Sequence, residues 1–347
     1  DRAAGVAEFR RLTDAGQKQA IAREFMQNIA ALHAMDAGHV RLDGGAQSRR
    51  IADHVRAELA IWRAMADEVG RPDPLIDFAF AWLQANLPDP DERVVLAHGD
   101  AGPGNFMFDR GRLTALIDWE LAHLGDPMED LAWFSMRCVM EPVPDFAASL
   151  RDYETFAGRP IDRARVLYHR VFVSARVVVI RHRNVTGEPG HAIVSRGLNR
   201  RLLVEALAAA SGTALPPSPP VEAADTAQAA LYDRVLNDLR DVVVARSTDR
   251  QVTAAAKNAA KVVKYLREID RLGRAADNAE LAALAALLGR ASASVETGHA
   301  ALSAALRAGT VPFERALEYF AGHAAREAQL AAAASGGIAH RHYPKLP

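Results

Sequence analysis

Residues 94–105 read VVLAHGDAGPGN, and residues 116–120 read LIDWE. The four consecutive apolar residues at 94–97 predict a short buried strand, and the glycines and the proline that follow predict a loop. The predicted strand therefore leads directly into a loop that carries His98 and Asp100.

A hairpin is predicted between these two stretches. Residues 105–117 contain two strand-like runs, NFMF and LTALI, separated by DRGR, whose glycine suits a tight turn. The hairpin begins at Asn105, and its second strand ends at Asp118. We therefore expect the carboxylates of Asp100 and Asp118 and the amide of Asn105 to lie near one loop.

Two carboxylates and one amide oxygen are the groups that phosphoryl transfer needs. One carboxylate must orient the attacking hydroxyl and accept its proton, and a pair of oxygen ligands must hold Mg²⁺ against the phosphates. Mg²⁺ favours hard oxygen ligands and is often held by one or two carboxylates together with the substrate phosphates. The residue types in this segment therefore point to phosphoryl transfer and require neither a thiol nor a metal-binding histidine.

The same residues resemble a known family. His98, Asp100 and Asn105 match the protein-kinase pattern H-R-D-x-x-x-x-N with glycine in the second position, a variant similar to the aminoglycoside phosphotransferase and choline kinase group. Residues 117–120 (IDWE) are similar to that group's form of D-F-G, and residues 125–132 (GDPMEDLA) to its G-D-P-x-x-D-L-A element. Three motifs in the right order are much more specific than any one of them.

The resemblance covers roughly residues 17–212. Residues 25–33 (FMQNIAALH) resemble the helix that precedes the catalytic core, and residues 119–127 are most similar to the subgroup associated with acyl-CoA dehydrogenases. The resemblance implies a mainly α fold with a small β-hairpin region (α+β), which is a protein-kinase-like carboxyl-terminal lobe. A carboxyl-terminal all-α helical bundle is expected to follow it.

The resemblance also implies roles for residues. Asp100 would be the catalytic base, and Asn105 and Asp118 would hold Mg²⁺ and, through it, the nucleotide. ATP would be the phosphate donor, although the sequence does not distinguish ATP from GTP. The acceptor would be a hydroxyl of a small molecule, and the subgroup favours a hydroxyacyl compound or a similar acid over an antibiotic.

Four other polar residues are expected to support the site. His98 fits a buried histidine that braces the loop through a hydrogen bond. Asp126 is expected to support the loop backbone, and Asp130 either caps a helix or supports the loop, because it precedes an apolar helical run. Glu120 stays open between a contact with the metal or the substrate hydroxyl and simple solvation.

Two functions of other classes also stay open. One is a non-catalytic binding or regulatory protein that keeps the kinase-like fold without binding a nucleotide. The other is a metal hydrolase that uses His98, Asp100, Asp118 and His123, although the presence of Asn105 argues against it.

Apolar residues at helical spacing predict helices around these motifs. Those expected in a first domain, residues 1–213, span 17–35, 48–69, 73–87, 128–139, 145–156, 162–183 and 192–211. Residues 215–220 (LPPSPP) cannot be helix interior, because proline lacks the backbone N–H and clashes with the preceding turn. We therefore expect a linker at 214–222.

A second domain is expected at 223–347, where the composition shifts toward Ala, Leu, Arg and Glu. Amphipathic patterns predict helices at 226–246, 251–272, 278–288 and 312–333, with Asp277 and Ser292 as helix N-caps. Four to six such helices would form an all-α bundle. This domain is similar to an uncharacterised one appended to bacterial members of the kinase group.

Composition excludes several classes of function. A formal net charge of -1 gives no basic surface for nucleic acid and no polybasic membrane signal, and no apolar run is long enough to span a bilayer. The single cysteine, Cys138, rules out an internal disulfide and fits a reducing compartment. We therefore expect a cytoplasmic protein whose partners are a nucleotide and a small molecule, with self-association through an exposed apolar face.

Kinases of this group also need a β-rich amino-terminal lobe with a lysine that grips the phosphates. Only sixteen residues precede Gln17, and they contain neither a glycine-rich loop nor a lysine-bearing strand. We therefore expect residues 1–347 to lack that lobe, as a fragment or a natural truncation, and to fold without phosphorylating a substrate by themselves.

Overall fold

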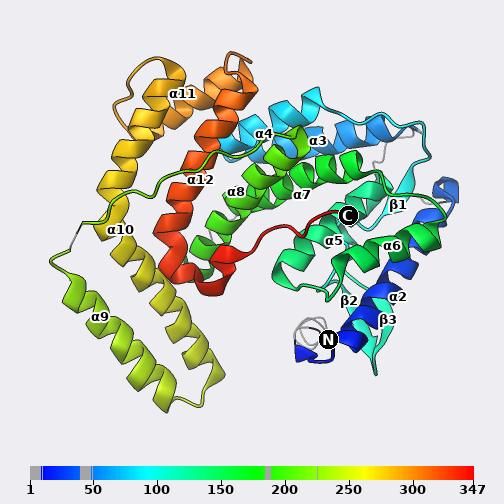
Figure 1. Cartoon of the computed structure of the whole chain (residues 1–347), viewed down its shortest axis with the longest axis horizontal. Coiled ribbons are helices and arrows are strands. Elements are labelled where there is room, and N and C mark those ends of the chain that lie inside the picture. Colours follow the sequence, from blue (N-terminus) through cyan, green and yellow to red (C-terminus); the bar gives the residue numbers. More distant parts are fainter. Residues whose placement is uncertain (1–8, 10, 40–47, 49, 184–188, 225) are drawn as a thin grey trace. The chain divides into compact units, whose positions relative to one another are not determined.

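The computed structural model describes residues 9, 11–39, 48, 50–183, 189–224 and 226–347, and most of these residues are helical (Figure 1). The chain divides into two compact units that alternate along the sequence. The first unit comprises Asp1–Trp62, Leu83–Val173 and Arg341–Pro347, and the second comprises Arg63–Trp82 and Ser174–His340.

Three helices contribute residues to both units: α3 (Ile51–Asp67), α4 (Pro74–Ala85) and α7 (Arg163–Arg183). The sequence-based division into residues 1–213 and 223–347, with a linker at 214–222, stays a prediction.

Helices of the first unit begin where the sequence places a capping carboxylate. Asp14 accepts a hydrogen bond from the Gln17 amide at 3.1 Å, and Asp145 accepts one from the Ala148 amide at 2.8 Å. Such bonds satisfy amides that have no partner within the helix. Besides its share of the three helices above, the unit contains α2 (Ala15–Ala34), η1 (Ala37–His39), α5 (Pro127–Met140) and α6 (Phe146–Ala157).

Two small antiparallel sheets lie in this unit. β2 (Phe106–Asp109) pairs with β3 (Arg112–Leu116) in the hairpin that the sequence predicts. β1 (Val95–Ala97) pairs with β4 (His123–Gly125), which was not predicted, because three residues ending in glycine give no readable alternation. The predicted fold class, mainly α with a small β-hairpin region, is confirmed.

Aromatic packing fixes the hairpin within the first unit. Phe25 of α2 lies between Phe106 of β2 and Phe134 of α5, with ring centroids 5.4 Å and 5.7 Å away. All three rings are buried, and burial of each stabilises the fold by about 1.5–3 kcal/mol. Phe106, the first residue of β2, is therefore packed against α2, whose Phe25 packs in turn against α5.

Among its described residues the second unit contains helices and connecting loops but no strand. Leu284 of α10, Leu302 of α11 and Phe320 of α12 are buried in its core. The elements after α7 are α8 (Pro189–Ser211), α9 (Ala229–Asn237), a π-helical stretch η3 (Asp238–Val244), α10 (Arg250–Leu288), α11 (Val295–Arg307), α12 (Phe313–Ser335) and η4 (Gly336–His340).

Two predictions for this region were wrong. The helices expected at 251–272 and 278–288 form one continuous helix, α10, so Asp277 lies inside a helix and is not an N-cap. The buried positions Leu272, Ala276, Glu280 and Leu284 continue one helical face across the expected break. The glycine at 273 costs only about 1 kcal/mol in a helix, and that face outweighs it.

The second wrong prediction concerns α11, for which the sequence predicted an N-cap at Ser292 but no helix range. Its N-cap is Ser294, two residues beyond the predicted Ser292. Ser294 and Thr297 form a reciprocal capping box, with the Thr297 amide donating to Ser294 Oγ at 3.2 Å. A threonine in place of the usual Glu or Gln hid this signal in the sequence.

None of the helices in the described part of the chain combines the length and the apolar character that crossing a bilayer requires.

Candidate active site

The loop after β1 approaches another segment so closely that only glycine fits at its second position. Gly99 has φ +77°, and a Cβ atom there would lie 1.9 Å from the carbonyl oxygen of Leu121. Leu121 ends the short 3-10 helix η2 (Trp119–Leu121), so any side chain at Gly99 would push apart the loop and η2. This contact explains why glycine follows His98 in place of the arginine found in protein kinases.

The carboxylate of Asp130 holds this loop in place through hydrogen bonds to its backbone. Its carboxylate accepts the backbone N–H of His98 at 2.8 Å and that of Gly99 at 2.9 Å. Nε2 of His33, on α2, lies 3.0 Å from the same carboxylate, and His33 Nδ1 lies 2.8 Å from the hydroxyl of Tyr153. Asp130 thus makes the contacts that a loop-supporting residue requires.

The electrostatics of Asp130 agree with this arrangement. Burial alone would raise the pKa of its carboxyl, but the bonds from His33 and from the His98 backbone outweigh burial and lower the pKa. The sequence did not single out His33 or Tyr153 as support residues, because neither belongs to the motif that carries Asp130.

Asp100 is buried and tied to two partners. Nε of Arg137, on α5, donates to Oδ1 of Asp100 at 2.8 Å, and a second guanidinium nitrogen donates to Oδ2. Nδ2 of Asn105 donates to Oδ2 at 2.8 Å and to the Asp100 carbonyl oxygen at 2.8 Å. The structure therefore brings Asp100 and Asn105 together and adds Arg137, which the sequence did not reveal.

The end of the hairpin is connected to the same loop. The Ile117 amide donates to the Asn105 carbonyl at 3.0 Å, and His98 Nε2 donates to the Ile117 carbonyl at 3.0 Å. Asp118 follows immediately and has a left-handed backbone, φ 72° and ψ 57°. Such a conformation is strained in residues other than glycine and occurs often at functional sites.

His98 makes the contacts of a bracing histidine. Its side chain is fully buried, its ring centroid lies 4.6 Å from that of Trp119, and its Nε2 holds the strand end that carries Asp118. Glu120 is exposed, so its role stays open between contact with a substrate and solvation.

Asp126 anchors the start of α5. It accepts the Met128 amide at 2.9 Å, pairs with two nitrogens of Arg165, and lies 3.1 Å from His169 Nε2. Burial would raise the pKa of its carboxyl, but His169 and Arg165 outweigh burial and lower that pKa. Asp126 is thus a charged anchor for the helix that bears Asp130 and Arg137.

The metal-hydrolase alternative finds no support in the geometry. His123 Nδ1 lies 2.9 Å from the Leu121 carbonyl, and its Nε2 lies 3.4 Å from Glu129. Among the described residues, the one group of three or more His, Cys, Asp or Glu side chains with metal-ligand spacing lies in the second unit and contains none of the four residues proposed for a hydrolase.

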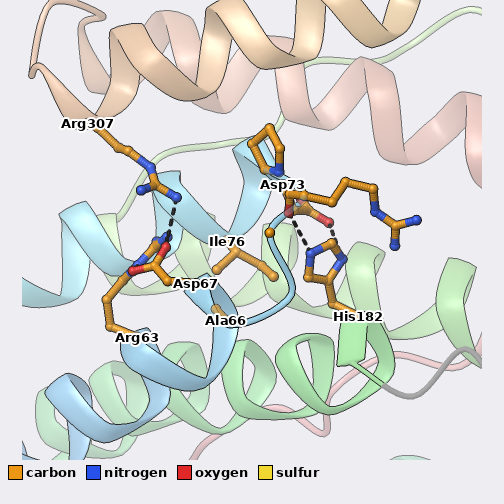
Figure 2. Close-up of a pocket in the computed structure, with 10 residues that line it drawn as sticks. Arg63, Ala66, Asp67, Asp73, Ile76, His182 and Arg307 are labelled. Atoms are coloured by element: carbon orange, nitrogen blue, oxygen red, sulfur yellow. Dashed lines mark hydrogen bonds and ion pairs between the residues drawn. The ribbon is translucent and has the colours of Figure 1, made fainter.

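The second unit contains a cavity of about 380 Å³, with Arg63, Asp67, Asp73, His182 and Arg307 on its walls (Figure 2). Two of its arginines are already paired: Arg63 and Arg307 lie 2.6 Å and 2.9 Å from the buried carboxylate of Asp77. None of the residues predicted for the active site lines this cavity.

Asp100, the candidate base, lies on the loop formed by His98, Gly99 and Asp100, which Asp130 anchors. A hairpin that ends at Asp118 follows this loop. The kinase-like phosphotransferases have this arrangement. Residues 4–167 match the sequence model of the "Phosphotransferase enzyme family", and that segment includes the loop, the hairpin and α5. This part of the chain is therefore a domain of that family, as the motifs predicted.

Two relatives carry the predicted link to acyl-CoA dehydrogenases. "Acyl-CoA dehydrogenase family member 11" from Homo sapiens is 31% identical over 135 residues, which are 37% of this chain and 17% of that protein. "Acyl-CoA dehydrogenase family member 10" from Mus musculus is 29% identical over 140 residues, 40% of this chain and 12% of that protein. The chain thus matches less than a fifth of the length of these relatives, and the predicted resemblance is confirmed.

Among solved structures, the chain is similar to the macrolide 2'-phosphotransferase MphH from Brachybacterium faecium. The two are 27% identical, with a TM-score of 0.37, and the similarity covers 48% of this chain and 54% of that chain.

Proposed function

We propose that this phosphotransferase domain transfers the γ-phosphate of a nucleoside triphosphate, ATP in the first instance, to a hydroxyl of a small molecule. The observation that carries the proposal is the placement of Asp100. Its carboxylate is buried, oriented by Arg137 and Asn105, and mounted on a loop that Asp130 fixes through two backbone amides. A base must be held in this way to position a hydroxyl for attack.

Asp100 would act as the general base. It would accept a hydrogen bond from the acceptor hydroxyl and take its proton as the oxygen attacks the γ-phosphorus and the bond to the β-phosphate oxygen breaks. Arg137 now occupies the carboxylate, but its side chain is 33% exposed, so it can give way on one oxygen when the hydroxyl arrives. In that state Arg137 would still orient the other oxygen.

Asn105 and Asp118 fit an Mg²⁺ ion. The Asn105 nitrogen donates to Asp100, which leaves the amide oxygen as the ligand atom, and Asp118 adds a carboxylate at the hairpin end that Ile117 ties to Asn105. Both atoms are hard oxygen donors, which Mg²⁺ prefers. When bound, the ion would neutralise charge on the phosphates, and these two residues would orient the nucleotide through it.

The acceptor class follows from the relatives. Their names connect this type of domain with acyl-CoA dehydrogenases, so a hydroxyacyl compound or a similar hydroxy acid is the first acceptor to test. A non-catalytic protein with the same fold is the competing function, and it predicts no transfer to any acceptor.

The test is a transfer assay on the native polypeptide, meaning the protein at its full natural length and not residues 1–347 by themselves. The assay contains γ-labelled ATP, Mg²⁺ and a panel of hydroxyacyl compounds, hydroxy acids and aminoglycosides. We expect Mg²⁺-dependent label on a hydroxyacyl compound or hydroxy acid, and none with Asp100→Asn. Label on an aminoglycoside alone would support kinase activity but contradict the proposed acceptor class. Absence of both nucleotide binding and transfer to any acceptor would favour the non-catalytic protein.

A further inference from the structure

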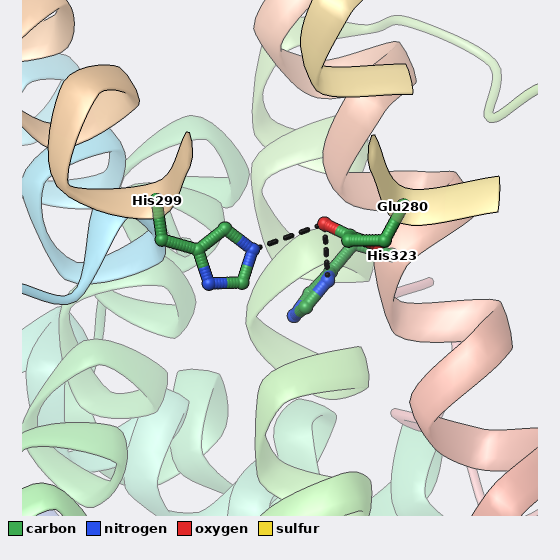
Figure 3. Close-up of side chains that lie close together, drawn as sticks. All are labelled: Glu280, His299 and His323. Carbon is green, nitrogen blue, oxygen red and sulfur yellow. Dashed lines mark hydrogen bonds and ion pairs between the residues drawn. The ribbon is translucent and has the colours of Figure 1, made fainter. Parts of the chain in front are cut away.

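Three helices of the second unit direct polar side chains to one point (Figure 3). Oε1 of Glu280, on α10, lies 3.0 Å from Nε2 of His299, on α11, and 3.0 Å from Nδ1 of His323, on α12. The hydroxyl of Tyr319, on α12, contacts the same carboxylate oxygen and lies 3.0 Å from His299 Nε2. The ligand atoms of Glu280 and the two histidines all lie within 4.8 Å of one another.

The number of donors around this oxygen is unusual. An ionised carboxylate offers about two lone pairs on each oxygen. Oε2 of Glu280 is occupied by Arg326, whose Nε donates to it at 2.9 Å. Three further groups, from His299, His323 and Tyr319, crowd around Oε1 alone. One cation at the centre would be bound by all of these groups.

The spacing of the ligand atoms fits a small tetrahedral site. With zinc–ligand bonds of about 2.0–2.2 Å, neighbouring ligand atoms lie about 3.3–3.6 Å apart. The two edges from Glu280 Oε1 to His299 and His323 measure 3.0 Å. Rotations of these side chains that open these two edges by a few tenths of an ångström, with the two histidine nitrogens brought to a similar spacing, would admit the ion.

The surroundings supply the outer contacts that metal ligands usually have. His323 turns its second nitrogen, Nε2, toward Glu327 Oε2 at 3.6 Å, while Arg326 holds the second oxygen of Glu280. A ligating histidine commonly points its other nitrogen at a carboxylate, and a ligating carboxylate is commonly hydrogen-bonded itself. Glu327 is fixed in turn by Arg200, whose Nε donates to it at 2.9 Å.

The cluster is closed on one side and accessible on the other. The side chains of Glu280 and His323 are 7% and 10% exposed, whereas that of His299 is 24% exposed. An ion can therefore reach the centre past His299 and is then surrounded by buried groups, as a stable metal site requires.

We propose that Glu280, His299 and His323 bind one divalent cation of the zinc class, with the Tyr319 hydroxyl or a water molecule as the fourth ligand. Two imidazoles and one carboxylate are a ligand set that suits zinc. Because each of the three residues comes from a different helix, the ion would pin α10, α11 and α12 together. The site would be a stabilising element of the second unit, independent of phosphoryl transfer.

The test is calorimetric titration of Zn²⁺ into the metal-stripped full chain, repeated for three variants of the cluster and one control variant. We expect one ion per chain for the wild type and no binding for His299→Gln and His323→Gln. Glu327→Gln should weaken binding by about 10–100-fold, the usual effect of losing an outer partner. The matched control is His191→Gln, which changes an exposed histidine of the same unit and should bind like the wild type.

A second measurement does not depend on any variant folding. Cobalt(II) added to the stripped wild-type chain should give the strong visible absorption of a four-coordinate site, and Zn²⁺ should abolish it. Zn²⁺ should also raise the Tm of the wild type but not that of His299→Gln, the variant at the most exposed ligand. Absence of the cobalt spectrum, or equal Zn²⁺ affinity of His299→Gln and His191→Gln, would overturn the proposal and leave the cluster as a network of ion pairs and hydrogen bonds.

Discussion

The loop around Asp100 in the first unit and the cluster around Glu280 in the second unit both contain a buried carboxylate held by an arginine. The two carboxylates are similarly buried, with 12% and 7% of their side chains exposed. Their partners differ, because Arg137 is 33% exposed whereas Arg326 is 15% exposed and acts with three other donors.

Under the proposed function, this difference would separate a reactive carboxylate from a structural one. Asp100 can exchange one hydrogen bond for a substrate hydroxyl by a movement of a single surface side chain. Glu280 cannot lose its partners without disturbing two further helices. We therefore expect changes at the first carboxylate to affect rates and changes at the second to affect metal binding and stability.

The largest expected effect follows from removing the proposed base, Asp100. In the native polypeptide, Asp100→Asn should lower kcat by about 10²–10⁴-fold or more, because proton transfer and hydroxyl positioning are lost together. Nucleotide affinity and thermal stability should change little. Turnover within about threefold of the wild type would show that another residue is the base.

The next effect tests whether Arg137 orients that base. Arg137→Gln should lower kcat by about 10–100-fold, because a misplaced catalytic group costs up to that factor. Arg151→Gln is the matched control, since Arg151 is 60% exposed and pairs only loosely with Asp145 at 3.9 Å. Equal rates for the two variants would mean that the Asp100–Arg137 pair has no part in catalysis.

A smaller effect concerns acid stability of the second unit. Burial opposes ionisation of Asp73, but Arg200 outweighs it and lowers the pKa of Asp73 to about 2. An unfolded aspartate has a pKa of about 3.9, so the stabilisation, about 2–3 kcal/mol, is fully present above about pH 5 and is lost progressively as the pH falls through 2.

Asp73→Asn should therefore destabilise the chain at pH 6 and only about half as much at pH 3, as measured by denaturant unfolding at both pH values. Asp233→Asn is the control, because Asp233 is 64% exposed in the same unit. A destabilisation by Asp73→Asn that stays the same at both pH values would contradict the assignment.

The smallest effect is the low reactivity of the thiol of Cys138, the residue that follows Arg137. Burial raises the pKa of the Cys138 thiol to about 12. Its thiolate is therefore scarce at pH 8, and iodoacetamide should label Cys138 only after denaturation. Rapid labelling of the folded chain, followed by mass spectrometry, would show that α5 opens beside the active site.

Distance along the sequence explains which residues of the candidate site could be predicted. His98, Asp100 and Asn105 lie within eight residues, so a motif and its spacing identify them together with the loop and the hairpin. Arg137 was missed because its partner, Asp100, is 37 residues away and helical periodicity says nothing about pairing. His33 was missed for the same reason, since Asp130 is 97 residues away.

The cluster in the second unit left no local pattern. Glu280 and His299 are 19 residues apart, and Glu280 and His323 are 43 apart, on helices whose packing the sequence does not reveal. The expected break near Asp277 also hid Glu280, because it placed that residue in the first turn of a short helix. Only the continuous α10 shows that Glu280 lies on a buried face.

The most direct test of the central claim, that Asp100 and the Asn105–Asp118 pair have separate tasks, is calorimetric titration of Mg²⁺-ATP into the native polypeptide and two variants. Asp118→Ala should weaken Mg²⁺-ATP binding strongly, because one of two proposed metal ligands is lost, whereas Asp100→Asn should bind like the wild type. Unchanged affinity in Asp118→Ala would contradict the account and move the metal site elsewhere, with Glu120 as the next residue to test.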